Sequence, residues 1–191
     1  MIKKIAVIGT GVIGTGWIIR CLAHSFKVIA YDKDPKSKKK VIEEIRRASP
    51  FVKKLFNKKK INFKNFQYVT SLEAALKDAD FIQENATENY KIKTKLMNLI
   101  GKYAKNNAII SSSSSGLLPT KIYSKCKNPA RTMIGHPFNP VYLCPGVEVV
   151  AGKKTKTKFL NKANKFYKSI SMNPIIVKKE LPGYLADRLQ E

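Results

Sequence analysis

The amino-acid sequence predicts an α/β protein with a doubly wound, mostly parallel sheet. Short apolar runs of strand length alternate along the chain with segments of helical periodicity, and this alternation is typical of a parallel sheet covered by helices on both faces. The first apolar run also leads directly into three spaced glycines, in IGTGVIGTGW. A glycine-rich turn after the first strand is typical of doubly wound sheets that bind a ligand at the ends of their strands.

The N-terminal strand–helix–strand unit is the clearest part of the pattern. Residues 2–8 lead into a continuous apolar run at 5–8, as expected for a strand that is buried on both faces of a sheet. Residues 12–24 have apolar side chains at helical spacing, and KVIAYD at 27–32 has the composition of a second strand. Because such units form right-handed crossovers, the two strands are expected to be parallel.

The later elements continue the alternation. A lysine-rich amphipathic helix is expected at 36–47, ended by Pro50, since proline lacks an amide hydrogen and clashes with the preceding turn. The remaining expected elements are helices at 51–56 and 71–77, strands at 66–70 and 79–85, a helix at 89–103, a strand at 107–112, a short helix after Pro119, strands at 132–136 and 147–152, a helix at 156–169, a strand at 173–178 and a final helix after Gly183. We therefore expect one domain at 1–180 and the start of a second, helical domain at 181–191.

Length and composition indicate a soluble globular chain. At 191 residues the chain can form one domain that buries about 70% of the surface of its unfolded state. It has no run approaching the roughly 20 apolar residues that span a bilayer, and glycines interrupt the apolar N-terminus, unlike a secretory signal. Cys21, Cys126 and Cys144 have neither disulfide nor metal-ligand spacing. We expect a cytoplasmic protein without a metal and without a membrane partner.

The formal net charge of +24 is the most unusual bulk property. A strongly basic chain can bind nucleic acid or another anionic surface. Here the lysines are scattered along the whole chain, and arginine, the better ligand for bases and phosphates, is scarce. We therefore expect a solvated basic surface that attracts an anionic cofactor and has no specific nucleic-acid partner.

The spacing Gly9-x-Gly11-x-x-Gly14 is that of a dinucleotide-binding loop. The first glycine makes the turn, the second lets the backbone approach a pyrophosphate, and the third lets the helix pack closely on the strand. The helix that follows presents free amide groups to the phosphates. Asp32 ends the second strand 18 residues past Gly14, where a carboxylate can bind both ribose hydroxyls and repel a 2′-phosphate. These residues predict NAD as the cofactor.

The histidines and one serine run are candidates for chemistry. His136 lies in GHPFNP after a predicted strand, and Glu148 follows twelve residues later. A histidine acts as a base when a carboxylate holds its second nitrogen, although this spacing also fits a buried structural histidine. His24 ends the first predicted helix and is expected to be a helix-terminal residue. The serines at 111–115 fit either a polar loop or a substrate-binding hydroxyl, and the pattern alone singles out none of them.

Five segments of the chain have a recognisable pattern: IGTGVIGTGW, ADFIQENATE, SSSSSGLLP, GHPFNPVYLCPGVEVV and PGYLADRL. Together they resemble the 3-hydroxyacyl-CoA dehydrogenase superfamily over essentially the whole chain. The longest of the five is most similar to the carnitine-oxidising branch of that superfamily. The resemblance implies a Rossmann-fold NAD-binding domain, followed by an all-helical domain that makes dimer contacts and forms part of the substrate pocket.

The resemblance also implies roles for individual residues. His136 would be the catalytic base and Glu148 would orient it, while Ser114, or else the adjacent Ser115, would contact both nicotinamide and substrate. Asp187 takes an active-site position that is asparagine in the acyl-CoA enzymes, which makes a thioester substrate less favoured. Besides the three glycines and Asp32, the residues implied to contact the coenzyme are Val12, Ile13, Asn85, Glu88, Lys93 and Ser114.

The function implied by the resemblance is NAD-dependent oxidation of a small 3-hydroxy substrate, with L-carnitine as the leading example. A homodimer is expected if the helical domain is present. Another 3-hydroxy acid or a 3-hydroxyacyl-CoA is the alternative substrate. A second alternative is a truncated NAD-binding fragment without turnover, because the helical domain is not in this sequence. A third, based on charge alone, is a nucleic-acid-binding module.

Overall fold

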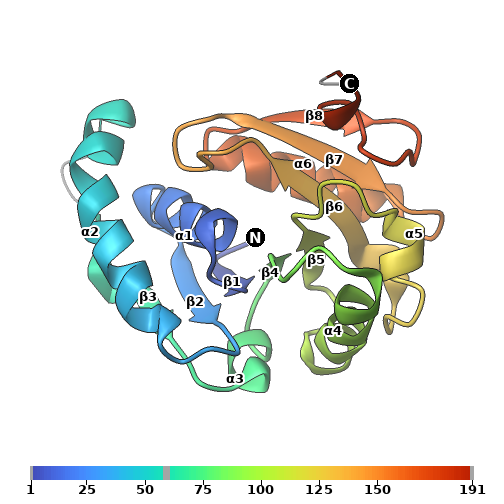
Figure 1. Ribbon diagram of the computed structural model, residues 1–191, viewed down its shortest axis with the longest axis horizontal. Coiled ribbons are helices and arrows are strands. Elements are labelled where there is room, and N and C mark those ends of the chain that lie inside the picture. Colours follow the sequence, from blue (N-terminus) through green and yellow to red (C-terminus); the bar gives the residue numbers. More distant parts are fainter. Residues whose placement is uncertain (1, 58–60, 190–191) are drawn as a thin grey trace.

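The computed structural model describes residues 2–57 and 61–189. Within these residues the chain forms an eight-stranded sheet in the order β3-β2-β1-β4-β5-β6-β7-β8, shown in Figure 1. All neighbouring strands are parallel except β6 and β7, which are antiparallel. The strands are β1 Lys4–Ile8, β2 Lys27–Tyr31, β3 Phe66–Tyr68, β4 Phe81–Glu84, β5 Ile109–Ser112, β6 Thr132–Pro137, β7 Gly146–Ala151 and β8 Asn173–Val177. This confirms the predicted doubly wound, mostly parallel fold.

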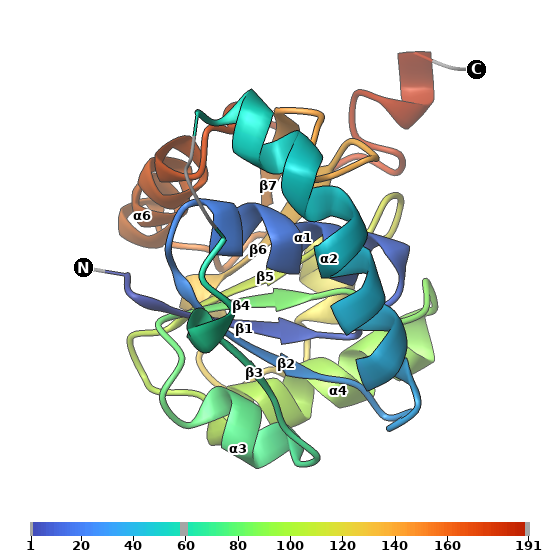
Figure 2. The same ribbon diagram turned by 90° about the vertical axis from the view of Figure 1, so that its left-hand side faces the viewer.

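Helices cover both faces of the sheet, as Figures 1 and 2 show. One hydrophobic cluster joins the sheet to α1, α2 and α6, and a second cluster joins it to α3, α4 and α5. Along β1, Ile5 and Val7 belong to the first cluster and Ala6 and Ile8 to the second, because successive side chains of a strand point to opposite faces. The helices are α1 Val12–Ala23, α2 Ser37–Leu55, α3 Leu72–Leu76, α4 Tyr90–Tyr103, α5 Pro119–Ile122 and α6 Thr157–Ser169.

The predicted break at Pro50 is wrong. Helix α2 continues through Pro50 to Leu55 as one helix. Its buried stripe, Val41, Ile45, Ala48 and Val52, lies on both sides of the proline. The packing of this stripe against the first cluster keeps the parts of α2 before and after Pro50 in register. Tertiary contacts therefore outweigh the one backbone hydrogen bond that proline removes.

The predicted final helix is also wrong. The segment after Pro182 forms turns, followed only by the short 3-10 helix η3 Asp187–Leu189. Gly183 and Tyr184 have φ values of 72° and 46°, which a right-handed helix cannot include. The amides of Leu185 and Ala186 donate to the carboxylate of Glu148 on β7. This tertiary contact, which the local sequence does not encode, holds the segment in a turn.

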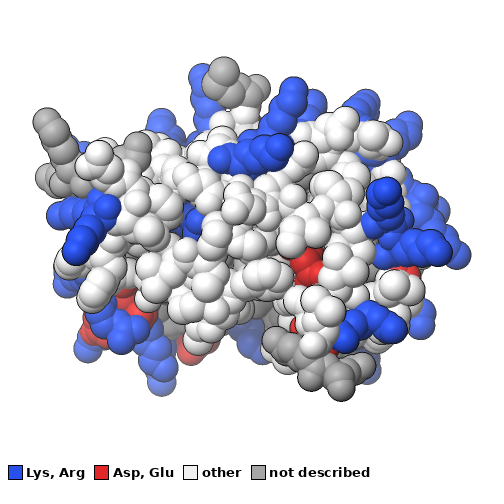
Figure 3. All heavy atoms as spheres, turned by 90° about the horizontal axis from the view of Figure 1, so that it is seen from above, with Lys and Arg blue, Asp and Glu red and all other residues white. Residues whose placement is uncertain are grey.

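The described residues also bear on membrane spans, metal ligands, cysteines and surface charge. None of their helices is long and apolar enough to cross a bilayer, and they contain no group of three or more metal-ligating side chains. All three cysteines are free thiols. On the face in Figure 3, Lys and Arg lie in separate groups around a broad uncharged centre and form no continuous basic stripe.

Arg20 is a buried cation that joins distant parts of the fold. Its guanidinium donates only to backbone carbonyl groups, and burial lowers its pKa to about 10. The acceptors belong to the loop between β6 and β7 and to the end of α6. They are the carbonyl oxygens of Val141, Cys144, Ile170 and Ser171. Arg20 therefore fixes helix α1 to the loop that follows His136.

Replacing this arginine should destabilise the fold. Arg20→Met is expected to lower the free energy of unfolding by about 3 kcal/mol or more, since several carbonyl groups lose their donor inside the protein. Urea unfolding followed by circular dichroism measures the change. The matched control is Arg47→Met, because Arg47 pairs with Glu44 on the surface and its loss should leave the urea midpoint nearly unchanged. Equal midpoints for the two variants would contradict the role given to Arg20.

Candidate active site

The candidate site lies at the carboxyl edge of the sheet. The glycine loop (residues 9–14) follows β1, Asp32 follows β2, Asn85 follows β4, and the serine loop (residues 113–116) follows β5. Since β1, β2, β4 and β5 are parallel neighbours, all four ends meet at one edge. In doubly wound folds, ligands bind in the crevice outside this edge.

The glycine loop is shaped by close backbone contacts. Gly9 has a φ of 85°, and a Cβ added there would lie 2.8 Å from the carbonyl oxygen of Asn85. A Cβ added to Gly14 would lie 1.9 Å from the carbonyl oxygen of Gly9, so only glycine lets α1 approach the turn. A Cβ on Gly11 would meet nothing within 4 Å. The first and third glycines are thus needed by the fold itself, and the second leaves open space for a ligand.

The start of α1 and the Asp32 carboxylate fit an anionic dinucleotide. No side chain caps the N-terminus of α1 and no acidic residue lies in its first turn, so its amide groups are available to phosphates. Val12, in this first turn, is 74% exposed, and Ile13 is half-buried. Asp32 accepts hydrogen bonds from the amide of Thr10, at 2.6 Å, and from that of Asp34, at 3.0 Å. These bonds hold the carboxylate beside the glycine loop.

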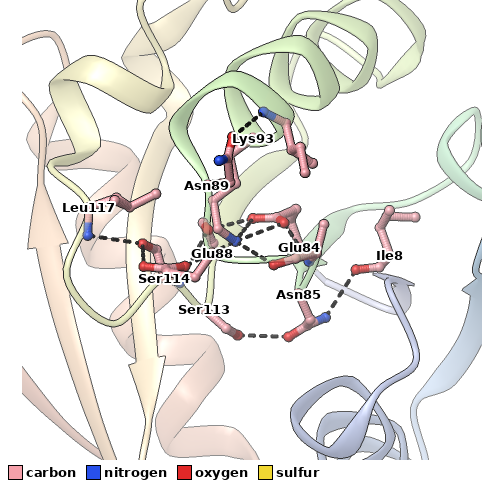
Figure 4. A network of polar contacts seen from close by, with 12 residues as sticks. Ile8, Glu84, Asn85, Glu88, Asn89, Lys93, Ser113, Ser114 and Leu117 are labelled. Atoms are coloured by element: carbon pink, nitrogen blue, oxygen red, sulfur yellow. Dashed lines mark hydrogen bonds and ion pairs between the residues drawn. The ribbon is translucent and has the colours of Figure 1, made fainter.

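Asn85 and Ser113 connect the ends of three strands. The side-chain amide of Asn85 donates to the carbonyl oxygens of Ile8, at 3.3 Å, and Gln83, at 2.9 Å. Ser113 donates to the Asn85 side-chain oxygen at 2.7 Å and accepts from the indole of Trp17 at 3.0 Å. Figure 4 shows this contact between β1, β4 and the serine loop. The single tryptophan of the chain therefore reports on the serine loop.

Ser114, Glu88 and Lys93 lie close together. Ser114 is buried and its hydroxyl donates to Glu88 at 2.5 Å, while the amides of Ser115 and Gly116 donate to the same carboxylate oxygen. The ammonium of Lys93 lies 3.6 Å from the other carboxylate oxygen of Glu88. Figure 4 shows these side chains between α4 and the serine loop. Glu88 is therefore the acceptor that orders this loop.

His136 and Glu148 form a buried pair on adjacent antiparallel strands. They are register partners of β6 and β7, and His136 Nδ1 lies 2.8 Å from Glu148 Oε2. Glu148 is fully buried and His136 is 8% exposed. Because a carboxylate accepts hydrogen bonds, Nδ1 is assigned the proton, which leaves the lone pair of Nε2 free to accept one. Nε2 makes no hydrogen bond among the described residues, so this nitrogen can serve as a base.

Tyr184 closes one side of this pair, and the sequence did not indicate it. Its ring centroid lies 5.8 Å from that of His136, and its hydroxyl donates to the carbonyl oxygen of Leu117 at 2.7 Å. Burial raises the pKa of the Tyr184 phenol, so it stays neutral. The nearby amides of Leu185 and Ala186 donate to Glu148 Oε1, which leaves Oε2 for the histidine.

Two residues considered in the sequence lie outside these contacts. Asp187 begins η3 and is half-buried, and its carboxylate makes no hydrogen bond or ion pair within the described residues. His24 contacts the carbonyl oxygen of Arg20 and the hydroxyl of Ser171 at the end of α1, as expected for a helix-terminal residue.

Glu84, which pairs with Lys93 at 3.0 Å, was not singled out from the sequence. A carboxylate at the end of a strand, followed by a helix with a lysine facing it, is a signal that could have indicated this pair.

A large cavity lies at the opposite edge of the sheet. It has a volume of about 1060 Å³, and its lining includes Lys4, Lys27 and Ile109, the first residues of β1, β2 and β5. This is the amino edge, away from the glycine loop and from His136. The chemistry-bearing residues therefore place the candidate site at the carboxyl edge.

Comparison with known proteins agrees with this geometry. Residues 4–181 match the family "3-hydroxyacyl-CoA dehydrogenase, NAD binding domain". The chain is 44% identical over 189 residues to an L-carnitine dehydrogenase of Oceanobacillus iheyensis, covering 99% of this chain and 62% of the relative. It is 42% identical to that of Pseudomonas aeruginosa, covering 100% of this chain and 59% of the relative. The chain thus spans about three fifths of the length of these curated relatives.

Solved structures share the same fold. A 5-formyl-3-hydroxy-2-methylpyridine 4-carboxylic acid 5-dehydrogenase, described as an NAD⁺-dependent dismutase, superposes with a TM-score of 0.92 at 28% identity, covering 100% of this chain and 62% of that chain. The 3-hydroxybutyryl-CoA dehydrogenase of Escherichia coli K12 superposes with a TM-score of 0.90 at 25% identity, covering 99% of this chain and 40% of that chain.

Two glycine substitutions should separate folding from ligand binding. Gly14→Ala is expected to lower the free energy of unfolding by about 3 kcal/mol or more, because its Cβ would overlap the Gly9 carbonyl oxygen. Gly11→Ala should change that free energy by less than about 1 kcal/mol, since its Cβ would enter open space. It should instead weaken dinucleotide binding, because the Cβ occupies the space a pyrophosphate needs. Urea unfolding and a binding titration measure both effects, and unchanged binding by Gly11→Ala would contradict this interpretation.

Proposed function

The chain belongs to the 3-hydroxyacyl-CoA dehydrogenase family through its NAD-binding domain, and on this premise we propose that it takes part in NAD-dependent oxidation of L-carnitine to 3-dehydrocarnitine. The buried His136–Glu148 pair, at the same sheet edge as the glycine loop, is the observation that best supports this proposal. The choice of substrate rests on the similarity to several L-carnitine dehydrogenases at 40–44% identity.

The described residues fit NAD. The uncapped start of α1 and the open space at Gly11 suit a pyrophosphate. The Asp32 carboxylate accepts from the amide and hydroxyl of Thr10 on one oxygen and from the amide of Asp34 on the other, which keeps a lone pair for a ribose hydroxyl. When bound, NAD supplies a nicotinamide ring that accepts the hydride.

The protein residues would handle the proton and orient the substrate. His136 Nε2 would accept the proton of the substrate hydroxyl as the carbon–oxygen double bond forms. Glu148 would stabilise the resulting imidazolium, because it already accepts from Nδ1. Ser114 would exchange its bond to Glu88 for one to the substrate oxygen. Asp187 would approach the substrate from the C-terminal turn, whose amides already hold Glu148.

The alternatives concern the substrate and the extent of activity. Oxidation of another 3-hydroxy acid or a 3-hydroxyacyl-CoA would use the same histidine, and a panel of these substrates distinguishes them. A domain that binds NAD without turnover would bind NADH normally and oxidise none of them. The cytoplasmic location and the homodimer stay predictions.

Coenzyme choice should be visible through Trp17. NADH is expected to quench Trp17 emission by energy transfer, because the indole lies beside the glycine and serine loops. NADPH should bind at least about tenfold more weakly, since its 2′-phosphate would meet the Asp32 carboxylate. Fluorescence titrations with both nucleotides measure this. Equal binding would contradict the role of Asp32, and absence of binding by either nucleotide would contradict the NAD proposal.

His136 should be required for turnover and not for coenzyme binding. His136→Gln is expected to reduce L-carnitine oxidation by about 100-fold or more, because the proton acceptor is lost. Its NADH affinity should stay within about twofold of wild type, because His136 contacts none of the proposed coenzyme residues. NADH formation at 340 nm measures turnover. The matched control is His24→Gln, at the far end of α1, which should keep wild-type turnover, and equal losses in the two variants would refute the assignment.

A further inference from the structure

We propose that Glu84, a residue with no assigned role, is a positioning residue that holds the serine loop in its binding geometry. The inference deepens the proposed function and rests on it, since the serine loop is the part of the site that would meet nicotinamide and substrate. Glu84 itself is fully buried, so it can act only through the groups it contacts.

The carboxylate of Glu84 joins three elements. Oε1 accepts from the amide of Ala86 at 2.6 Å, and Oε2 accepts from the hydroxyl of Ser112 at 2.5 Å. Both oxygens accept from the ammonium of Lys93 at 3.0 Å. The end of β4, helix α4 and the end of β5 therefore meet at one carboxylate (Figure 4).

The ammonium of Lys93 lies between the carboxylates of Glu84 and Glu88 and is closer to Glu84. The Lys93 side chain is 1% exposed, and its ammonium also donates to the carbonyl oxygen of Ala86 at 2.9 Å. Glu88, the second acid, lies 3.6 Å away and is 42% exposed at its side chain. A buried ammonium without a partner is costly. Because Glu84 pairs with Lys93, Lys93 does not need a close ion pair with Glu88.

Two routes lead from Glu84 to Ser114. In the first, Ser112 donates to Glu84 and its oxygen accepts from the amide of Ser114 at 3.3 Å. In the second, Glu84 satisfies Lys93 and leaves a Glu88 oxygen for the hydroxyl of Ser114. That same oxygen accepts from the amides of the next two residues, at 3.0 and 3.2 Å. Consecutive amides of the serine loop thus depend on contacts that Glu84 organises.

Neutralising Glu84 should release this loop. In Glu84→Gln the side chain keeps its shape and loses its charge, and one of its acceptor oxygens becomes a donor that faces Lys93 or Ser112. The Lys93 ammonium is then expected to pair with Glu88, the remaining acid within reach, and to pull it from the serine loop. The loop would lose its acceptor, although the fold around it would stay intact.

The test compares Glu84→Gln with a variant that only destabilises the same region. Met97→Ala is the matched control, because Met97 is a fully buried residue of α4 that packs in the second cluster and makes no polar contact with the serine loop. Both variants should lower the melting temperature. Only Glu84→Gln should weaken NADH binding, by tenfold or more, and change the Trp17 emission maximum, since the indole donates to Ser113. Its kcat for L-carnitine should fall by tenfold or more, whereas that of Met97→Ala should not.

A second variant keeps the proposal testable if Glu84→Gln does not fold. Ser112→Ala removes the hydrogen bonds that link Glu84 to Ser114 through Ser112 and leaves the Glu84–Lys93 ion pair in place. It should therefore shift the Trp17 emission and weaken NADH binding as Glu84→Gln does, by a smaller factor. Wild-type emission and affinity in Ser112→Ala would overturn the proposal. So would wild-type values in a folded Glu84→Gln, or equal changes in Met97→Ala.

Failure of the proposed function would look different. If the wild-type chain binds NADH and oxidises no 3-hydroxy substrate, the catalytic proposal fails, while the differences in NADH affinity among the variants still test the role of Glu84. If the wild-type chain binds no NADH, Trp17 emission and its quenching by acrylamide still report whether the serine loop is released in Glu84→Gln.

Discussion

The parallel pairing of β1 with β2 and β4, and of β4 with β5, is the constraint on which the site depends. It brings the glycine loop, Asp32, Asn85 and the serine loop to one edge although 80 residues lie between Asp32 and Ser113. Strands β1 and β4 are hydrogen-bonded neighbours, so the glycine loop and Asn85 leave the sheet side by side. Their backbones lie so close that a Cβ on Gly9 would come within 2.8 Å of the Asn85 carbonyl oxygen.

The antiparallel pair β6–β7 adds a different kind of contact. Parallel neighbours bring loops together, whereas this pair places His136 directly opposite Glu148 within the sheet. The short distance between the His136 ring and the Glu148 carboxylate is therefore set by the backbone hydrogen bonds of the sheet and not by a flexible loop. The turn at 182–186 then covers the pair and uses the second oxygen of Glu148. A histidine held in this way keeps a single orientation of its ring, as the proposed proton transfer would require.

Charge is distributed differently on the surface and in the interior. Most of the lysines are exposed, and they account for the net charge without forming a continuous stripe on the face in Figure 3. Among the described residues, the buried cations include Arg20 and Arg131, which donate to backbone carbonyl groups, and Lys93, which pairs with carboxylates. Arg20 and Lys93 order loops next to the site, whereas the exposed lysines provide a general attraction for anions.

The sequence by itself determined the fold class, the cofactor loop and nearly every strand. Glycine spacing and apolar runs express local steric rules, which any chain with these residues obeys. The pairing of His136 with Glu148 was only one of two interpretations until the β6–β7 register placed them face to face. Tertiary structure alone decided that α2 continues through Pro50, that the segment after Gly183 is a turn, and that Glu84 meets Ser112. In each case the deciding contact joins residues that are distant in sequence or depends on burial, and local pattern contains no information about either.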